Sequence, residues 1–325
     1  MSAPKSWLGE LIPKCFRRYS NDEVKSRPEL FFKTSNNYDC IEEAQIEVFM
    51  GFLAKQFGFK NAMIYHPALV HGEAGVYCDK WPSETYDNVK LHTDLFDELA
   101  KVIQKDYDKL PADQQKQARS VLNDFPAISP FRDHCPVSIK QLCDTLPLLS
   151  RYITRSALYD NIKLPCFDYV FSQTDRHNAN MAFHQNQSGI YDKYILFDNA
   201  FALSHLFAGE LIHDIEENIK EMDNLTMCFG AVGYNRKIKD FPRELKLINS
   251  RIPTEFRKQI ISDCKKVDID EATYECKEIT GMEVPDKLYA YAQILYEEHA
   301  PKLINALSDS ADKVNVIMNE SSMSR

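Results

Sequence analysis

The sequence Phe171-Ser-Gln-Thr-Asp-Arg-His-Asn-Ala-Asn180, followed by Tyr194-Ile-Leu-Phe-Asp-Asn-Ala-Phe201, decides which fold is expected for this chain. The first stretch is a polar turn that holds Asp175 and Asn180, and the second is an apolar, strand-like run that ends at Asp198. Phosphoryl transfer needs such side chains, because a carboxylate accepts the proton of the attacking hydroxyl while an Asn and an Asp hold metal on the phosphates. A lone D-x-x-x-x-N is frequent by chance, whereas the ordered series of turn, strand, turn, strand and Asp is much rarer. The pattern therefore predicts a kinase active site.

The polar residues of this pattern also have structural interpretations. Asp175, the expected catalytic carboxylate, could instead cap the turn or helix that follows it. Asn180 and Asp198 are the expected metal ligands, because magnesium takes oxygen donors and often only one or two of them from protein; they could also be ordinary turn residues. His177 is expected either to orient the Asp175 loop, as part of the catalytic set, or to be satisfied by backbone in a packed turn. Arg176 is expected either to contact phosphate or to pair with a surface acid.

The front of the chain carries a predicted Lys–Glu pair. Residues 29–34 are typical of a short strand that contains Lys33. Apolar residues at intervals of three and four from 41 to 57 predict an amphipathic helix that contains Glu47. In kinases a front-sheet Lys reaches the nucleotide phosphates and a helix Glu holds it in position. We therefore expect Lys33 to pair with Glu47, with Glu43 of the same helix as the main alternative.

The remaining pattern predicts two lobes. Further strands are expected at 61–65 and 74–78, a ribbon at about 180–185 and 193–198, and helices at about 90–107, 112–124, 137–160, 164–172, 205–222, 254–268 and 284–307. The expected fold is α+β, with a small β-rich N-lobe containing one helix (1–82) and a larger, mainly helical C-lobe (83–325) that holds the catalytic loop 173–180. Cys78 and Asp79 end the last front strand, where backbone groups are expected to meet the adenine of a bound nucleotide.

Composition limits the classes of function. The 325 residues are 44% hydrophobic and 27% charged, as in ordinary globular proteins. The net charge of −9 has the wrong sign for a broad nucleic-acid footprint, so direct nucleic-acid binding is not expected. There is no long apolar run and no signal-like start, and the nine cysteines never occur as C-x-x-C. We expect reduced thiols, no membrane association and a cytoplasmic location, or secretion as an effector without a conventional signal peptide.

Several of these motifs resemble those of one kinase family. The segment from Glu47 to Gly58 resembles the E-x-x-x-x-x-L-A-x-x-x-G helix of the HipA-like kinases, and residues 174–180 resemble their T-D-x-H-x-x-N loop. Phe197 and Asp198 resemble their metal-binding Asp motif. The Asp-Arg-His-x-x-Asn form is also similar to the catalytic loop of the phosphoinositide kinases.

The resemblance implies a serine/threonine protein kinase that uses ATP and Mg²⁺, with a protein substrate and, in toxin-type members, an antitoxin-type partner. A lipid or small-molecule kinase on the same fold, and a pseudokinase that binds without turnover, are the alternatives. The chain resembles the short members that lack an extra N-terminal subdomain. It departs from the family at residues 10–32, which contain no glycine where a phosphate loop is expected. Either the segment from Ser20 to Asp22 forms a turn of another kind, or the grip on phosphate is weakened.

Overall fold

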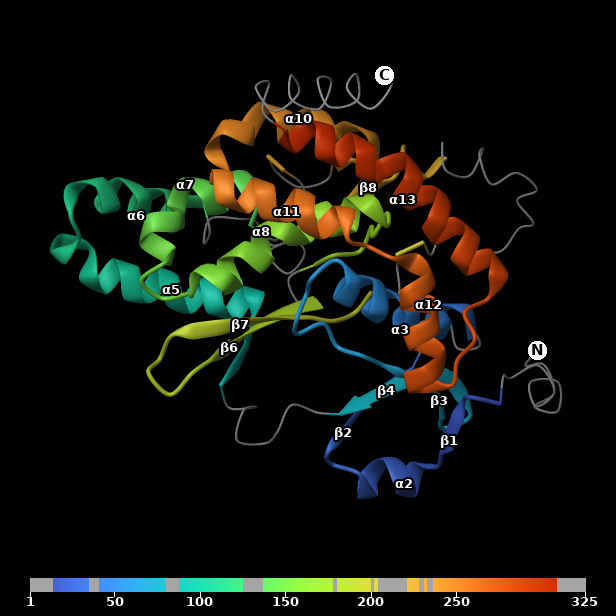
Figure 1. Cartoon of the computed structure of the whole chain (residues 1–325). Coiled ribbons are helices and arrows are strands. Elements are labelled where there is room, and N and C mark those ends of the chain that lie inside the picture. Colours follow the sequence, from blue (N-terminus) through green and yellow to red (C-terminus); the bar gives the residue numbers. More distant parts are fainter. Residues whose placement is uncertain are drawn as a thin grey trace, which may run out of the picture.

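Strands and helices alternate in the front part of the chain, and helices dominate the rest (Figure 1). The computed structural model describes residues 14–34, 41–79, 88–124, 137–177, 180–199, 202–203, 221–227, 231–232 and 236–308. The front elements are β1 (Arg17–Tyr19), α2 (Asn21–Ser26), β2 (Leu30–Thr34), α3 (Ile41–Gln56), β3 (His66–Val70) and β4 (Glu73–Asp79). The elements that follow are β5 (Val89–Leu91), α5 (His92–Asp106), α6 (Ala112–Asp124), α7 (Ile139–Leu149), α8 (Arg155–Val170), β6 (Met181–Gln185), β7 (Tyr191–Leu196), β8 (Thr226–Met227), β9 (Arg236–Lys237), α10 (Phe241–Ile248), α11 (Thr254–Lys265), α12 (Ile269–Thr280) and α13 (Asp286–Leu307).

The front sheet has the strand order β1-β3-β4-β2, with β1 parallel to β3 and the other pairs antiparallel. A two-residue turn joins β3 to β4, and both of its residues, His71 and Gly72, have positive φ (58° and 86°). Such turns suit the twist of a hairpin. The strand predicted at 61–65 is wrong, because the paired residues are 66–70 and include Pro67. Hydrophobicity alone did not show where this hairpin begins.

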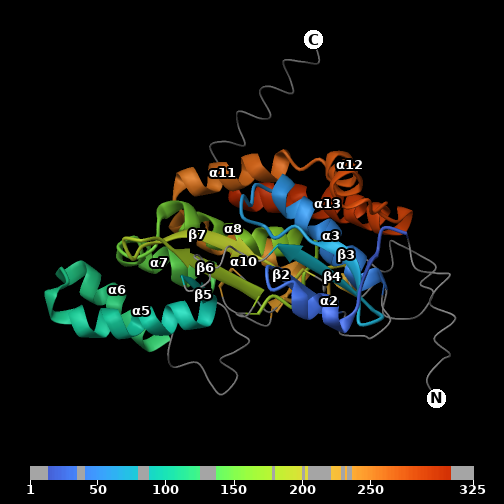
Figure 2. The ribbon, with the colours of Figure 1, turned by 90° about the horizontal axis from the view of Figure 1, so that it is seen from below.

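Helix α3 lies between the front sheet and α12, and is buried on all sides (Figures 1 and 2). Every residue from 43 to 54 is buried, including the side chains of Glu43 and Glu47. The helix was predicted to be amphipathic, with one polar face, and that prediction is wrong. A helix that is covered all round belongs to the core of the molecule rather than to its surface.

Within the glycine-free segment, residues 21–26 form the short helix α2 rather than a loop. Ser20 caps it, because its hydroxyl accepts from the Glu23 amide while the Glu23 carboxylate accepts from the Ser20 amide. Val24 packs against a small cluster on the face of the sheet that lies away from α3 (Figure 1). The members of that cluster are Tyr19, Leu30, Ala68 and Val70. Because strand side chains alternate between faces, Lys33 lies on the other face.

The helical part differs from the prediction at one junction. A single helix was predicted over 137–160, but α7 and α8 are separated by a break at residues 150–154. The Thr154 hydroxyl then accepts from the Ala157 amide and starts α8. The helix predicted at 164–172 is the second half of α8. The short helices α10 and α12 were not predicted.

Two predictions fall on undescribed residues. The expected lobe boundary at 82–86 and most of the helix expected at 205–222 lie outside the part of the chain that the structure describes.

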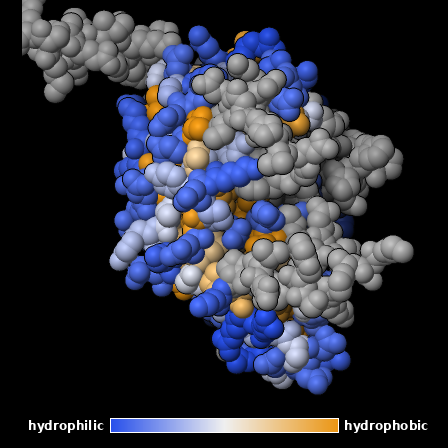
Figure 3. All heavy atoms as spheres, turned by 90° about the vertical axis from the view of Figure 1, so that its right-hand side faces the viewer, coloured by the Kyte–Doolittle hydropathy of each residue, from blue (hydrophilic) through white to orange (hydrophobic). Residues whose placement is uncertain are grey.

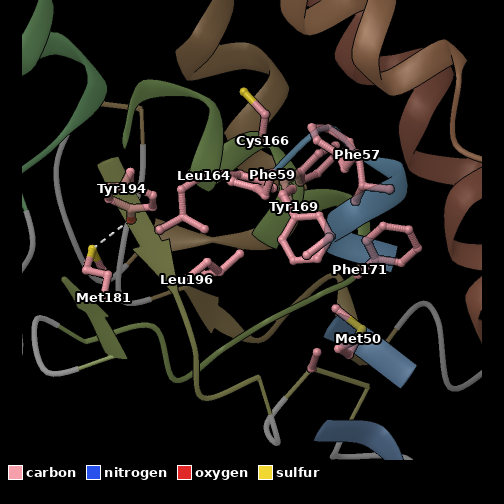
Figure 4. Close-up of a cluster of buried hydrophobic side chains, with 14 of the residues drawn as sticks. Met50, Phe57, Phe59, Leu164, Cys166, Tyr169, Phe171, Met181, Tyr194 and Leu196 are labelled. Carbon is pink, nitrogen blue, oxygen red and sulfur yellow. Dashed lines mark hydrogen bonds between the residues drawn. The ribbon is translucent and has the colours of Figure 1, made fainter. Parts of the chain in front are cut away.

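A buried cluster joins α3 and α8 to the β6–β7 ribbon (Figure 4). Its labelled members are Met50, Phe57, Phe59, Leu164, Cys166, Tyr169, Phe171, Met181, Tyr194 and Leu196. The Tyr194 hydroxyl donates to the Met181 sulfur at 3.1 Å inside it. The ribbon that precedes Asp198 is therefore packed on the same core as the helix that carries Glu47.

The surface is mainly hydrophilic on the face shown in Figure 3, with small hydrophobic areas between polar side chains. Among the described residues, the large exposed hydrophobic side chains are those of Phe31, Leu91, Leu247, Tyr274 and Ile279. Among the described helices, none combines the length and apolar character needed to cross a bilayer.

Candidate active site

Three elements bring Lys33, Glu47 and Asp198 together. The Lys33 Nζ lies 3.0 Å from Glu47 Oε2 and 2.5 Å from Asp198 Oδ1. Lys33 comes from β2, Glu47 from α3, and Asp198 follows β7. The second Glu47 oxygen, Oε1, accepts from the Asn199 amide at 2.9 Å. Glu47 thus joins the Lys33 strand to the segment that carries Asp198, and it is the partner of Lys33 in place of Glu43.

The charges of this group are strongly coupled. Burial raises the pKa of Glu47, and Lys33 works against that rise. Burial would lower the pKa of Lys33, but the carboxylates of Glu47 and Asp198 raise it above its ordinary value. A charged ammonium therefore lies between two carboxylates, at a side chain that is still 19% exposed. The Lys33 ammonium can bind an anionic ligand when that ligand replaces one of the two carboxylates as its partner.

The segment 61–65, which is not a strand, supports Asp198 from the front lobe. The Met63 amide donates to the Leu196 carbonyl at 2.9 Å, at the end of β7. Gly51 of α3 makes this approach possible, because a Cβ at that position would lie 2.7 Å from the Met63 carbonyl oxygen. Asp198 itself has φ of 56°, a left-handed conformation that Asp tolerates better than most residues. The chain turns sharply there, directly after the ribbon.

The described residues of the catalytic loop, 173–177 and 180, are held together by side-chain and backbone hydrogen bonds. The Asn180 Nδ2 donates to the Asp175 carbonyl at 2.9 Å. The Asp175 amide donates to Gln173 Oε1 at 3.2 Å. The backbone of His177 accepts from the Asn180 amide and donates to the Asp175 carbonyl. These bonds fix the backbone of the expected catalytic turn, and the catalytic role of the Asp175 and His177 side chains stays a prediction.

Arg176 lies at the centre of this loop and is fully buried. Its guanidinium contacts both carboxylate oxygens of Asp168, with Nη2 at 3.1 Å from Oδ1. Nη1 donates to the carbonyls of Phe197 and Asp198 at 2.8 and 3.1 Å, and Nη2 donates to Asn199 Oδ1 at 2.5 Å. Both interpretations considered for Arg176 are wrong. Its guanidinium is buried, so it is not placed to contact a phosphate, and its acidic partner Asp168 is buried rather than on the surface. Arg176 ties the catalytic turn to the Asp198 segment.

Asp168 is the buried counter-ion of this arginine. Burial raises its pKa to about 6, and Arg176 offsets part of the rise. The Asp168 side chain is fully buried on α8, within the apolar run from Cys166 to Val170. A carboxylate in such a run is a signal that sequence reasoning missed, since a buried charge needs a partner.

The sheet face that carries Lys33 continues toward the end of β4. Lys33 is opposite Val76, and Phe31 is opposite Cys78, so these four side chains share one face. Phe31 is 38% exposed there, and Cys78 is buried. Asp79 points to the other face by alternation, which leaves its backbone as the part that could meet a nucleotide.

Asn180 and Asp198 have the chemistry of a magnesium site completed by phosphates. Because the Asn180 Nδ2 is engaged with Asp175, the amide oxygen is the atom that remains for a metal. The carbonyls of Asn180 and Asp198 both accept from the same Arg176 nitrogen, so the two backbones lie side by side. Among the described residues no cluster of three or more His, Cys, Asp or Glu side chains could hold a metal by itself. An Asn amide oxygen and an Asp carboxylate fit Mg²⁺ brought with a nucleotide, where phosphates and water would supply most ligands.

This architecture defines a class: the chain has a two-lobed, α+β kinase-like fold, as its sequence predicted. The crystal structure of the Helicobacter pylori proinflammatory kinase CtkA is similar to it, with a TM-score of 0.54 and 12% identity, over 86% of this chain and 85% of that one. A Shewanella oneidensis MR-1 complex of HipA, HipB and operator DNA contains a chain with a TM-score of 0.45 and 11% identity, matched over 86% of this chain and 57% of that one. No protein-family model matches the sequence, and no curated protein does. At such identity the likeness to CtkA establishes the fold.

Proposed function

We propose that this protein is a kinase that uses Mg²⁺ and ATP to phosphorylate serine or threonine hydroxyls of a protein. The observation that carries the proposal is the contact of Lys33 with both Glu47 and Asp198, made by residues from three separate elements. In kinases a Lys–Glu pair and a metal-binding Asp must be in place together. Ion pairs on a protein surface often form by chance. An ion pair that joins β2, α3 and the segment after β7 through the buried Glu47 does not.

The nucleotide side of the site is assigned to Lys33, Asn180 and Asp198. Lys33 would bind phosphate oxygens, and Glu47 would hold its ammonium in place while it does so. Asn180 and Asp198 would hold Mg²⁺, whose chemistry when bound is to neutralise charge on the phosphates. The backbone at Cys78 and Asp79 would meet the adenine.

The acceptor side is assigned to Asp175. Its carboxylate would orient the acceptor hydroxyl and take its proton as the oxygen attacks phosphorus. His177, in the same turn, would orient this loop. Arg176 holds the turn against the Asp198 segment, so the acceptor and nucleotide sides keep a fixed separation.

One observation favours a pseudokinase as the second candidate. Helix α2 packs on the sheet face away from Lys33, so it would not cover phosphates bound at Lys33. Weak binding of the phosphates would allow a nucleotide to bind without efficient phosphoryl transfer.

The test is incubation of the purified full-length protein with ATP labelled on the γ-phosphate, alone and with a cell lysate. Label is expected in Ser or Thr of proteins, to depend on Mg²⁺ and to be lost in Asp175→Asn. An exposed surface variant, Asp113→Asn, is the matched control and should transfer normally. Label that appears only in the lipid or small-molecule fraction would show that the acceptor is not a protein. Nucleotide binding without any transfer would establish that the protein is a pseudokinase.

A further inference from the structure

A buried lysine from the helical lobe caps the end of α3. The Lys163 Nζ, on α8, donates to the Gly58 carbonyl at 2.9 Å, although the two residues are far apart in sequence. Its side chain is 1% exposed. The ammonium also lies 4.2 Å from the centre of the Phe59 ring. The C-terminal end of α3 is therefore bound by a positive charge from another part of the fold, which suits the negative end of a helix dipole.

The end of α3 is built to receive this group. The Gly58 amide donates to the Lys55 carbonyl and the Phe59 amide donates to the Ala54 carbonyl, the two bonds of a Schellman motif. Gly58 has φ of +83°, and a Cβ there would lie 3.0 Å from an Asp263 oxygen and 3.4 Å from the Lys163 Nζ. Glycine suits both the left-handed turn and the close approach of the Asp263 carboxylate.

The charge of Lys163 is compensated by two acids of the helical lobe. Asp160 Oδ1 lies 3.0 Å from its Nζ, and Asp263 Oδ2 lies 3.4 Å from it. Asp263 is itself held by the Tyr159 hydroxyl at 2.8 Å and by Gln259 Nε2 at 2.6 Å. The group is a connected polar network that joins α8, α11 and the end of α3.

Stability alone does not account for such a network. A buried ion pair often contributes no more than well-packed hydrophobic residues of similar volume would, since removing charges from water costs as much as their attraction returns. A methionine at position 163 could pack against Phe59 without any of these partners. What the lysine adds is a directional bond, which ties the Gly58 carbonyl at the end of α3 to α8.

We propose that Lys163 is a positioning residue for the active site, which holds α3 and thereby Glu47 in the orientation that pairs with Lys33. The inference rests on the proposed function, in which the position of that helix decides whether the Lys–Glu pair forms. Glu47 lies about 14 Å, at 1.5 Å per residue, before the last residue of α3, and Gly58 follows that residue directly after Phe57. A small rotation at the Gly58 end therefore moves the Glu47 carboxylate relative to both Lys33 and the Asn199 amide.

The chain offers a matched control on the same helix. Lys55 also joins α3 to the helical lobe, through Glu275 of α12 at 2.8 Å, but its side chain is 48% exposed. Exposed pairs of this kind contribute little. Lys163→Met and Lys55→Met therefore remove the same charge from the same region, and only the first removes a buried cap.

The experiment measures hydrogen exchange of the amides of α3 in the full-length protein without nucleotide, and then the affinity for Mg-ATP. Lys163→Met is expected to speed exchange in the second half of α3 about tenfold over Lys55→Met, and to weaken Mg-ATP about tenfold. Exchange that rises equally in α3 and in α5, which carries no member of the network, would show general destabilisation and overturn the proposal, as would exchange equal to the control. If Lys163→Met does not fold, the double variant Lys163→Met/Asp263→Asn, which also removes the carboxylate left unpaired, takes its place under the same criteria. Hydrogen exchange can be measured whether or not the protein is catalytically active. A wild type without phosphoryl transfer would refute the proposed kinase activity, and the exchange measurement would still test the role of Lys163 at the end of α3.

Discussion

Replacement of Arg176 by methionine tests the centre of the candidate site. The change leaves the fully buried Asp168 carboxylate without its counter-ion, which costs about 3–5 kcal/mol in such pairs. The carbonyls of Phe197 and Asp198 also lose a donor, at about 1 kcal/mol each. We therefore expect the free energy of unfolding of Arg176→Met to fall by at least about 3 kcal/mol at pH 7.

The loss should depend on pH with a definite sign. The folded pKa of Asp168 is raised from 3.8 to about 6, so the stability that this group contributes is present below pH 3.8 and lost as pH rises through 6. Because Arg176 lowers that pKa, its removal raises the pKa further and extends the loss to higher pH. The difference between wild type and variant should grow from pH 6 to pH 8, by at most about 1.4 kcal/mol per pH unit.

Urea unfolding followed by circular dichroism at pH 6, 7 and 8 measures both quantities. The double variant Arg176→Met/Asp168→Leu should recover most of the loss, since it removes both charges together. A loss below about 1 kcal/mol, or a difference that is constant with pH, would show that the pair is not buried as described.

Three further changes test the surrounding geometry. Gly51→Ala should destabilise the protein by about 1–3 kcal/mol in urea unfolding, against the gain that alanine usually brings in a helix, because its Cβ meets the Met63 carbonyl; higher stability would refute the close approach. Asp198→Ala should abolish the Mg²⁺ dependence of ATP binding in calorimetry, and the assignment fails if wild-type affinity is equal with and without the metal. Asp175→Asn should keep ATP affinity and lose at least about a hundredfold in kcat, whereas near-normal turnover would move the catalytic role to another residue.

Local patterns predicted the parts of the site that lie on regular elements. The strand with Lys33, the helix with Glu47 and the turn before the ribbon follow from hydrophobic period and turn residues, which act over a few positions. The spacing of Glu47 and Glu43 could not decide between them as partners of Lys33. That choice depends on how α3 packs against the sheet.

Features set by distant contacts were not predictable from the pattern. The burial of Arg176 depends on Asp168 and on the Asp198 segment, which meet it only in the folded chain. The break between α7 and α8 was missed because apolar residues continue through it, and the Thr154 cap was overlooked. Helix α3 was predicted to be amphipathic from apolar residues at intervals of three and four, but its charged residues Glu43 and Glu47 are buried as well.

The arrangement of the front sheet has a consequence for the order in which it can assemble. Of the three strand pairs in this sheet, only β3 and β4 are consecutive in sequence, and they are joined by the tight turn at His71 and Gly72. β1 and β2 pair with residues far along the chain, and each adds at an opposite edge. Because closing a long loop is slow, we expect the hairpin to form first and both edge strands to join it later. The strand that carries Lys33 would then join the sheet late, so the proposed nucleotide-binding face would be complete only when folding of the front lobe is nearly finished.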